Sequence, residues 1–144
     1  MRKPDFISNM SFPMGRDLGQ PTGVSVVQSC DSNIVDLFFG DRGDHLKWAF
    51  YDANLPGQEG QVFYISNLWK EKHCDRFLLS NVGCEQRNLV DLWSEAAVNQ
   101  QWRLLKIGDK VKTFGIEAVS ASQCTSKTTL SCAKSEHNNV DLWF

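Results

Sequence analysis

The 144-residue chain lacks a strong excess of one charge and lacks any long apolar run. Lys and Arg number 15 and Asp and Glu number 17, which gives a formal net charge of −2. Nucleic acids and anionic membranes bind clustered Lys and Arg, so this composition argues against both as partners. No stretch approaches the roughly 18–20 consecutive apolar residues that cross a membrane. We therefore expect no nucleic-acid partner and no membrane insertion.

The first ten residues, "MRKPDFISNM", contain two basic residues but no apolar stretch behind them. This pattern is not typical of a secretory signal peptide, so we expect a cytoplasmic protein or one exported by another route. A chain of this length can bury one substantial core. We expect a single domain over residues 1–144.

Motifs of catalysis and metal binding are also missing. The chain has no G-x-S-x-G nucleophile elbow and no Gly-rich phosphate-binding loop. The pairs His73–Cys74 and Cys132–His137 lack the paired C-x-x-C spacing of a zinc site. The tripeptide RGD at 42–44 is short enough to occur by chance. We therefore expect no enzymatic activity, no metal and no cofactor.

The five cysteines form an odd number, which argues against a closed disulfide framework. Nine residues separate Cys74 from Cys84, and seven separate Cys124 from Cys132. Extended strands would hold such pairs roughly 20 Å apart or more, whereas a disulfide requires Cα atoms within about 7 Å. We expect reduced and mostly buried thiols, with Cys30, Cys84 and Cys132 as small core side chains.

The chain does contain one short sequence motif three times, the VDL motif: "SNIVDLFF", "RNLVDLWS" and "HNNVDLWF". Val35, Val90 and Val140 are separated by 55 and 50 residues, which indicates three units of about 50 residues. Four landmarks recur in order: ISN with an apolar residue, a short apolar run, Cys followed by VDL and an aromatic, and a later Trp. The third copy lacks the last landmark. The expected units are 5–58, 59–108 and 109–144.

The segments within each unit are short, rich in Val, Ile, Phe and Trp, and separated by Gly, Asn, Asp and Ser, which predicts strands. "LWSEAAVNQQWRLLKI" (92–107) has helical propensity, but its counterpart "LFFGDRGDHLKWAF" (37–50) favours strand–loop–strand. "WKEKHCDR" (69–76) is expected to be a solvated loop. Three units of about four strands predict an all-β protein, a β-trefoil, because a propeller needs at least four blades.

With four strands expected in each unit, the third unit has no counterpart of the last strand, "NQQWRLL". An open barrel edge would result, and open edges favour pairing. Three explanations remain open: the natural protein continues, a partner chain supplies the strand, or residues 1–8 shift to close the barrel. We expect Trp143 and Phe144 to lie in a self-association surface, which makes a homodimer through the C-terminal region.

The segment "NLVDLWSEAAVNQQWRLL" (88–105) resembles the ricin-B-type lectin repeat, and "DHLKW" (44–48) is a degenerate version of its QxW signature. "FLLSNVGCEQRNLVDLW" and "TTLSCAKSEHNNVDLW" are similar to repeats of fungal and bacterial trefoil lectins. Ser94 and Glu95 stand where that family usually places a disulfide cysteine. The resemblance implies a non-catalytic β-trefoil lectin that binds galactose or GalNAc glycans of glycoproteins or glycolipids.

Strand alternation directs Val90 and Leu92 to the core and leaves Asp91 and Trp93 on the other face. A carboxylate beside an indole suits sugars, because the ring covers the C–H patch and the carboxylate accepts hydroxyl hydrogen bonds. The resemblance places the following residues in carbohydrate sites and Trp102 in the core: Asp91, Trp93, Asn99 and Gln100 in the second unit, Asp36 and Phe38 with Asp44 or His45 in the first, and Asp141 and Trp143 in the third.

Structural roles are the alternative for each of these residues. The repeated Asp could hold its hairpin through backbone amides, Trp93 and Trp143 could fill the hairpin cap, and Asn99 and Gln100 could be ordinary loop residues. The alternative function is a protein-binding β-trefoil, such as a protease inhibitor that acts through a surface loop. The candidate loops are 13–23 and 52–60, both rich in Pro and Gly.

Overall fold

The structure is a computed structural model. It describes residues 3–12, 22–38, 42–81, 90–106, 114–120, 129–132 and 140–143. The strands are β1 (Phe6–Asn9), β2 (Ser11–Phe12), β3 (Thr22–Val26), β4 (Val35–Phe38), β5 (Lys47–Asp52), β6 (Val62–Asn67), β7 (Leu78–Asn81), β8 (Val90–Trp93), β9 (Gln101–Lys106), β10 (Phe114–Ala118), β11 (Thr129–Cys132) and β12 (Val140–Trp143). The helical elements are α1 (Leu68–His73) and the 3-10 turns η1 (Gly43–Leu46) and η2 (Val98–Gln100).

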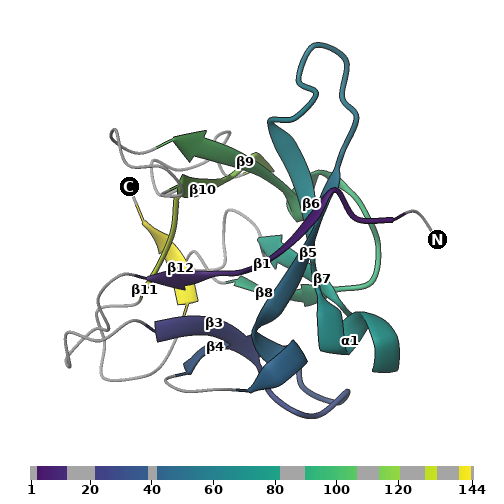
Figure 1. Cartoon of the computed structure of the whole chain (residues 1–144), viewed down its shortest axis with the longest axis vertical. Coiled ribbons are helices and arrows are strands. Elements are labelled where there is room, and N and C mark those ends of the chain that lie inside the picture. The colour runs from purple at the N-terminus through teal and green to yellow at the C-terminus, as the bar shows by residue number, and fades with distance from the viewer. Residues whose placement is uncertain are drawn as a thin grey trace.

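The described strands form the β-trefoil that the repeats predict. Strands β1, β5, β6, β9 and β10 pair in that order, all antiparallel, and make the barrel wall. Three hairpins, β3–β4, β7–β8 and β11–β12, make the cap, and β4, β8 and β12 lie against one another (Figure 1). The short strand β2 continues the line of β1 and pairs with β3. Among the described residues, no strand of the third unit corresponds to β5 or β9.

The alternation of side chains along the strands of the VDL motif determines which of its residues enter the core. Val90 and Leu92 are 7% and 0% exposed, and Val35 of the first unit is equally buried. Trp48 and Trp102 lie in the core at 0% exposure, which confirms the expectation for Trp102. Burial of such large rings is a main source of stability.

The two core tryptophans also bind the hairpins of their own units. The indole N–H of Trp48 donates to the carbonyl of Val24, and that of Trp102 donates to the carbonyl of Leu79, each over 2.9 Å. A buried indole N–H normally finds such a partner. The barrel strand and the hairpin of a unit are therefore locked together at equivalent positions.

The first ISN motif is not the structural counterpart of the second. Ser11 pairs with Gly23, and Ser66 pairs with Leu78, so these serines hold equivalent positions beside their hairpins. Met10, at 7% exposure, then corresponds to the fully buried residue before Ser66. The expected alignment of the ISN motif at 7–9 with the ISN motif at 65–67 is therefore wrong by three residues, because the apolar Met10 takes the buried position before the serine.

The segment 69–76 is not a solvated loop, because α1 occupies most of it. The helix begins after Asn67, whose side-chain oxygen accepts from the backbone N–H of Lys70 at 3.0 Å. The amide nitrogen of Asn67 donates to the carbonyl of His45, also at 3.0 Å. An Asn cap of this kind satisfies a helix-end donor that otherwise has no partner. No helix in the described part of the chain is long and apolar enough to cross a membrane.

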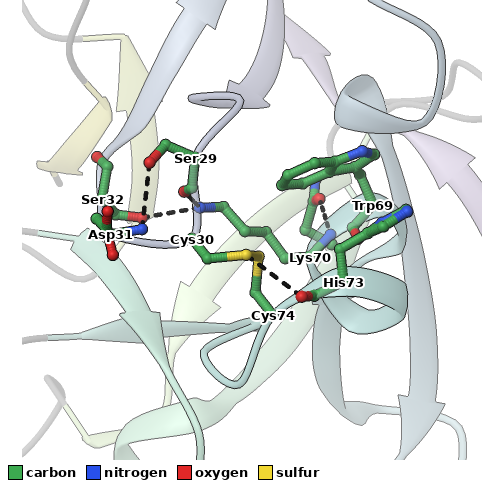
Figure 2. Close-up of a disulfide and its surroundings, with 9 residues drawn as sticks. Ser29, Cys30, Asp31, Ser32, Trp69, Lys70, His73 and Cys74 are labelled. Carbon is green, nitrogen blue, oxygen red and sulfur yellow. Dashed lines mark hydrogen bonds between the residues drawn. A yellow bond between two sulfur atoms is a disulfide. The ribbon is translucent and has the colours of Figure 1, made fainter.

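Lys70 is the surprising residue of α1, because its side chain is only 1% exposed. Its ammonium donates to the carbonyls of Ser29 and Ser32, the latter at 2.8 Å, in the connection between β3 and β4 (Figure 2). Burial lowers the pKa of Lys70, and the charge of Asp31 opposes this effect. The helix is thereby fastened to the first hairpin.

A disulfide joins the same two segments. Cys30, between β3 and β4, bonds to Cys74 at the end of α1, with a Cα–Cα distance of 5.3 Å and a sequence separation of 44 (Figure 2). The expectation of reduced, buried thiols is wrong for this pair, and Cys30 is exposed. The spacing argument compared only cysteines close in sequence, whereas this bond connects two units. Cys84, Cys124 and the side chain of Cys132 lie outside the described residues.

Candidate functional site

A Ser–Asp pair recurs at the same place in all three hairpins. Ser25 lies directly opposite Asp36, Ser80 opposite Asp91, and Ser131 opposite Asp141. The sequence analysis found the aspartates but missed their serine partners. The signal was present, because a serine follows the apolar run of each hairpin strand, in "GVSV", "LLSN" and "TLSC".

The second unit presents its acid and its aromatic side chain on the outer face of β8. Val90 and Leu92 point into the core, whereas the Trp93 side chain is 43% exposed and Asp91 is half-buried. The carbonyl of Trp93 accepts from the backbone N–H of Phe77 at 3.2 Å. The predicted alternation along this strand is therefore confirmed, and an indole lies two residues from a carboxyl on one face.

The Asp91 carboxyl has an unusual electrostatic environment. Burial raises its pKa from 3.8 to about 6, and the positive charge of Arg76 only partly opposes this shift. Among the described residues, none donates a hydrogen bond to the carboxyl. A carboxylate that held its hairpin through backbone amides would have a lowered pKa instead. These properties argue against a purely structural role and favour a binding role.

Arg76 belongs to the turn between α1 and β7 and lies over the indole of Trp93. Its guanidinium carbon is 5.4 Å from the ring centroid, and the side chain is exposed. Such a cation–π contact at an exposed position contributes about 0.5–1 kcal/mol. Arg76 therefore contacts the indole while much of the ring remains accessible to a ligand.

The two amides of η2 have different surroundings. Gln100 is only 4% exposed. Its amide nitrogen donates to the hydroxyl of Ser80 at 2.7 Å, and its oxygen accepts from the backbone N–H of Ala97 at 3.0 Å. Asn99 is exposed. Gln100 thus fixes the loop against β7, and Asn99 is the amide that faces solvent.

The corresponding face of the first unit is filled by Arg42. One guanidinium nitrogen lies 3.5 Å from both oxygens of Asp36, and it donates to the Ser25 hydroxyl at 3.2 Å and to the Val26 carbonyl at 3.1 Å. The guanidinium carbon lies 3.8 Å from the centroid of the Phe38 ring. Burial raises the pKa of Asp36, and Arg42 opposes the shift. Arg42 therefore contacts both the carboxylate and the aromatic ring that a ligand would need.

The other candidates of the first unit make contacts with α1. Asp44 forms ion pairs with Lys47 at 3.7 Å and with Lys72 at 3.3 Å. His45 is 7% exposed, and its ring stacks on Trp69 with centroids 4.5 Å apart. These contacts give both side chains roles in holding α1 against the η1 turn.

In the third unit, Asp141 and Trp143 lie on β12, where Trp143 is opposite Thr129. Their side chains lie outside the described part of the structure. Their backbone positions match those of Asp91 and Trp93, so the carbohydrate assignment for this unit stays a prediction.

No protein-family model matches the chain, and neither does any curated protein. Among solved structures, the chain is similar to a crystal structure of ThreeFoil, a designed 3-fold symmetric protein. The TM-score is 0.62 and the identity is 19%, over 85% of this chain and 81% of that chain. At this identity the similarity supports the fold alone.

Proposed function

We propose that the chain is a non-catalytic lectin of the ricin-B type that binds galactose or GalNAc glycans on the outer face of β8. The observation that carries this proposal is the pair Asp91 and Trp93. An exposed indole lies beside a half-buried carboxyl that has no hydrogen-bond donor among the described residues. Asn99, exposed on η2, offers an amide for a further polar contact.

The chemistry of this face suits a ligand rich in hydroxyls. The indole offers an apolar face to the C–H patch of a pyranose, and a carboxylate accepts charge-assisted hydrogen bonds from hydroxyls. With a pKa of about 6, Asp91 is largely ionised at neutral pH. Burial has already removed part of its hydration, so ligand hydroxyls would replace little water.

The number of sites follows from the differences between units. Arg42 fills the first face, so we infer that the second unit supplies the main site and that Asp141 and Trp143 contribute a weaker one. A homodimer through the C-terminal region remains a prediction. Such a dimer would present at least two sites to glycoproteins or glycolipids and would raise their combined affinity well above that of one site.

A glycan array followed by titration calorimetry with galactose and GalNAc tests the proposal. We expect selective binding to terminal Gal or GalNAc, and Trp93→Ala and Asp91→Asn each weaken binding at least about tenfold, since each loses 1.4 kcal/mol or more of contact. The matched control is Phe38→Ala in the first unit, which leaves binding unchanged. A blank array from folded protein, or an equal loss in both units, contradicts the proposal.

A second candidate function rests on the connection between β5 and β6, which projects beyond the rest of the molecule (Figure 1). The Asp52 carboxylate accepts from the backbone N–H groups of Asn54 at 2.8 Å and Gly60 at 2.7 Å. Asn54, Gly57 and Gly60 all have positive φ, between 54° and 76°. A projecting loop with fixed backbone geometry is what a protease inhibitor presents to its target.

A panel of serine and cysteine proteases separates the two functions. Under the inhibitor function, Pro56→Ala and Leu55→Gly reduce inhibition while Trp93→Ala has no effect. Of the other candidate loop, 13–23, residues 13–21 lie outside the described part.

A further inference from the structure

Ile34 of the first unit lies beside the acid of the second unit. The residue directly precedes β4, and its backbone forms an isolated antiparallel bridge with Asp91 of β8. Residues that face each other in an antiparallel pair project their side chains to the same side, with Cβ atoms about 4.5–5.5 Å apart. The Ile34 side chain therefore lies next to the Asp91 carboxyl, on the face that also carries Trp93.

The two cross-strand neighbours that the structure describes for Asp91 differ in accessibility. Ser80, opposite Asp91 on β7, is 4% exposed, and its hydroxyl accepts from the Gln100 amide. Ile34, across the bridge, is 56% exposed. The accessible neighbour of the acid is therefore an aliphatic side chain, which a ligand on this face can contact.

The segment that carries Ile34 is fastened to α1. The backbone N–H of Ile34 donates to the Ser32 hydroxyl at 3.2 Å. The Ser32 carbonyl accepts from the Lys70 ammonium at 2.8 Å, and Cys30 is bonded to Cys74 at the end of the helix. Because these contacts already order the segment, a ligand that contacts Ile34 loses little free energy in fixing it.

An apolar side chain beside a carboxyl discriminates between ligands that are rich in hydroxyls. A sugar whose hydroxyls donate to Asp91 brings its next substituent close to Ile34, because the two side chains are neighbours. A free hydroxyl at that position would lose water and find no hydrogen-bond partner on an aliphatic side chain. An acetamido group would place its methyl there and would bury apolar surface instead.

We propose that Ile34 is a specificity-determining residue of the site formed by Asp91 and Trp93. It makes this site prefer sugars that carry an acetamido group beside their hydroxyls, such as GalNAc, to plain galactose. The inference rests on the proposed lectin function and deepens it. The site is then built from two units, and the disulfide and Lys70, which join these units, also position its two parts.

Calorimetric titration of the full chain with methyl galactoside and with its N-acetylgalactosamine counterpart tests the inference. We expect the acetamido sugar to bind about fourfold more tightly, the ratio that corresponds to burial of one methyl group. Ile34→Thr keeps a β-branched side chain but replaces its longer apolar branch by a hydroxyl. This variant should lower the ratio to about one and leave the affinity for methyl galactoside within about twofold. Ile34→Val, which stays apolar, should keep most of the preference.

The matched control is Ile7→Thr, because Ile7 is similarly exposed, at 50%, but lies on β1 in the barrel wall. This variant should keep the preference of the parent chain. Equal affinities of the parent for the two sugars, or an unchanged ratio in Ile34→Thr, overturns the inference and leaves the lectin function standing. An equal loss of both sugars in Ile34→Thr also overturns it, because Ile34 would then only hold the site in shape.

Binding of neither sugar by the folded parent chain has a different meaning. That result contradicts the proposed lectin function, and the inference about Ile34 fails with it. The two failures are therefore distinguishable, since one leaves galactose binding intact and the other does not.

Discussion

The outer faces of β4 and β8 share one framework but differ in where an arginine lies. Both faces carry a Ser–Asp pair and an aromatic residue at equivalent positions. In the first unit, Arg42 lies 3.8 Å from the Phe38 ring and forms a half-buried ion pair with Asp36. In the second, the exposed Arg76 lies 5.4 Å from the Trp93 ring. The VDL motif alone therefore does not leave its acid and its aromatic ring open to a ligand.

The serine partners explain why the two acids differ. The Ser25 hydroxyl accepts from the charged Arg42, which also compensates Asp36. The Ser80 hydroxyl accepts instead from the neutral amide of Gln100, which brings no charge to Asp91. A neutral donor satisfies the serine without compensating the burial of the acid, and the charge of Arg76 opposes that burial only in part, so the pKa of Asp91 rises to about 6. The first face is held together by its own ion pair, whereas the second keeps an exposed indole beside a carboxyl that has no hydrogen-bond donor among the described residues.

The largest expected effect comes from the disulfide that connects these two regions. Cys30 lies in the connection that leads to β4, and Cys74 lies two residues before Arg76. Replacing both by Ser opens a loop of 44 residues and lowers the free energy of unfolding by about 3–4 kcal/mol. Urea denaturation of both proteins, with and without reductant, measures the loss.

Reductant should destabilise only the parent chain, since the double variant has lost the bond already. If the two proteins unfold at the same urea concentration under oxidising conditions, the bond does not contribute to stability. The two units would then be held together by their other contacts, among them the hydrogen bonds of Lys70 and Asn67.

The next largest effect separates the two arginines. Arg42→Ala removes the partner of Asp36 and of the Ser25 hydroxyl, which leaves a half-buried carboxylate uncompensated. The side chains of Arg42 and Asp36 are 24% and 21% exposed, so we expect a loss of about 2 kcal/mol rather than the value for a fully buried pair. Arg76→Ala changes stability by less than about 0.5 kcal/mol, because its side chain is exposed.

Urea denaturation at pH 7 measures both variants. Adding Asp36→Asn to Arg42→Ala should recover part of the loss, because it removes the uncompensated charge. An equal effect of the two alanine variants would show that the faces do not differ as the contacts indicate.

Much of the fold was predictable from the sequence because the repeats carry it. The spacing of the VDL motifs indicated three units. The alternation of side chains along their strands placed Val90 and Leu92 in the core and Trp93 outside it. The short helix α1 was missed, because six residues of mixed charge give little periodicity. Lys70 was taken as solvated, since the two carbonyls that bind its ammonium belong to a loop 38 and 41 residues away.

The candidate site was less predictable, because its selectivity depends on contacts across the chain. Arg42 in "GDRGDHLKW" reads as a polar loop residue, and nothing in that pattern shows its guanidinium turned onto Phe38. Gln100 was expected in the sugar site, whereas its amide contacts Ser80, 20 residues earlier in the chain. Residue types that form a repeat predict positions, but tertiary contacts decide which positions remain open to a ligand.

The smallest expected effect tests the difference between the two acids directly. The pKa of Asp91 is about 6 in the folded chain, against an ordinary value of 3.8, so the folded state binds the proton more tightly than the unfolded state. This contribution to stability is complete below about pH 4 and is lost as the pH rises to about 6. Asp91→Asn removes the buried charge and raises the free energy of unfolding at pH 7 by about 1 kcal/mol, discounted for partial exposure.

Denaturant unfolding from pH 4 to pH 8 measures this effect, with Asp36→Asn as the matched control. The parent chain should lose stability between pH 4 and pH 6 more steeply than the Asp91 variant. Asp36→Asn should not stabilise the chain at pH 7, because it leaves the Arg42 guanidinium without its carboxylate. Destabilisation by Asp91→Asn would mean that this carboxylate holds its hairpin. In that case Asp91 would resemble Asp36, and the distinction between the two faces would rest on Trp93 alone.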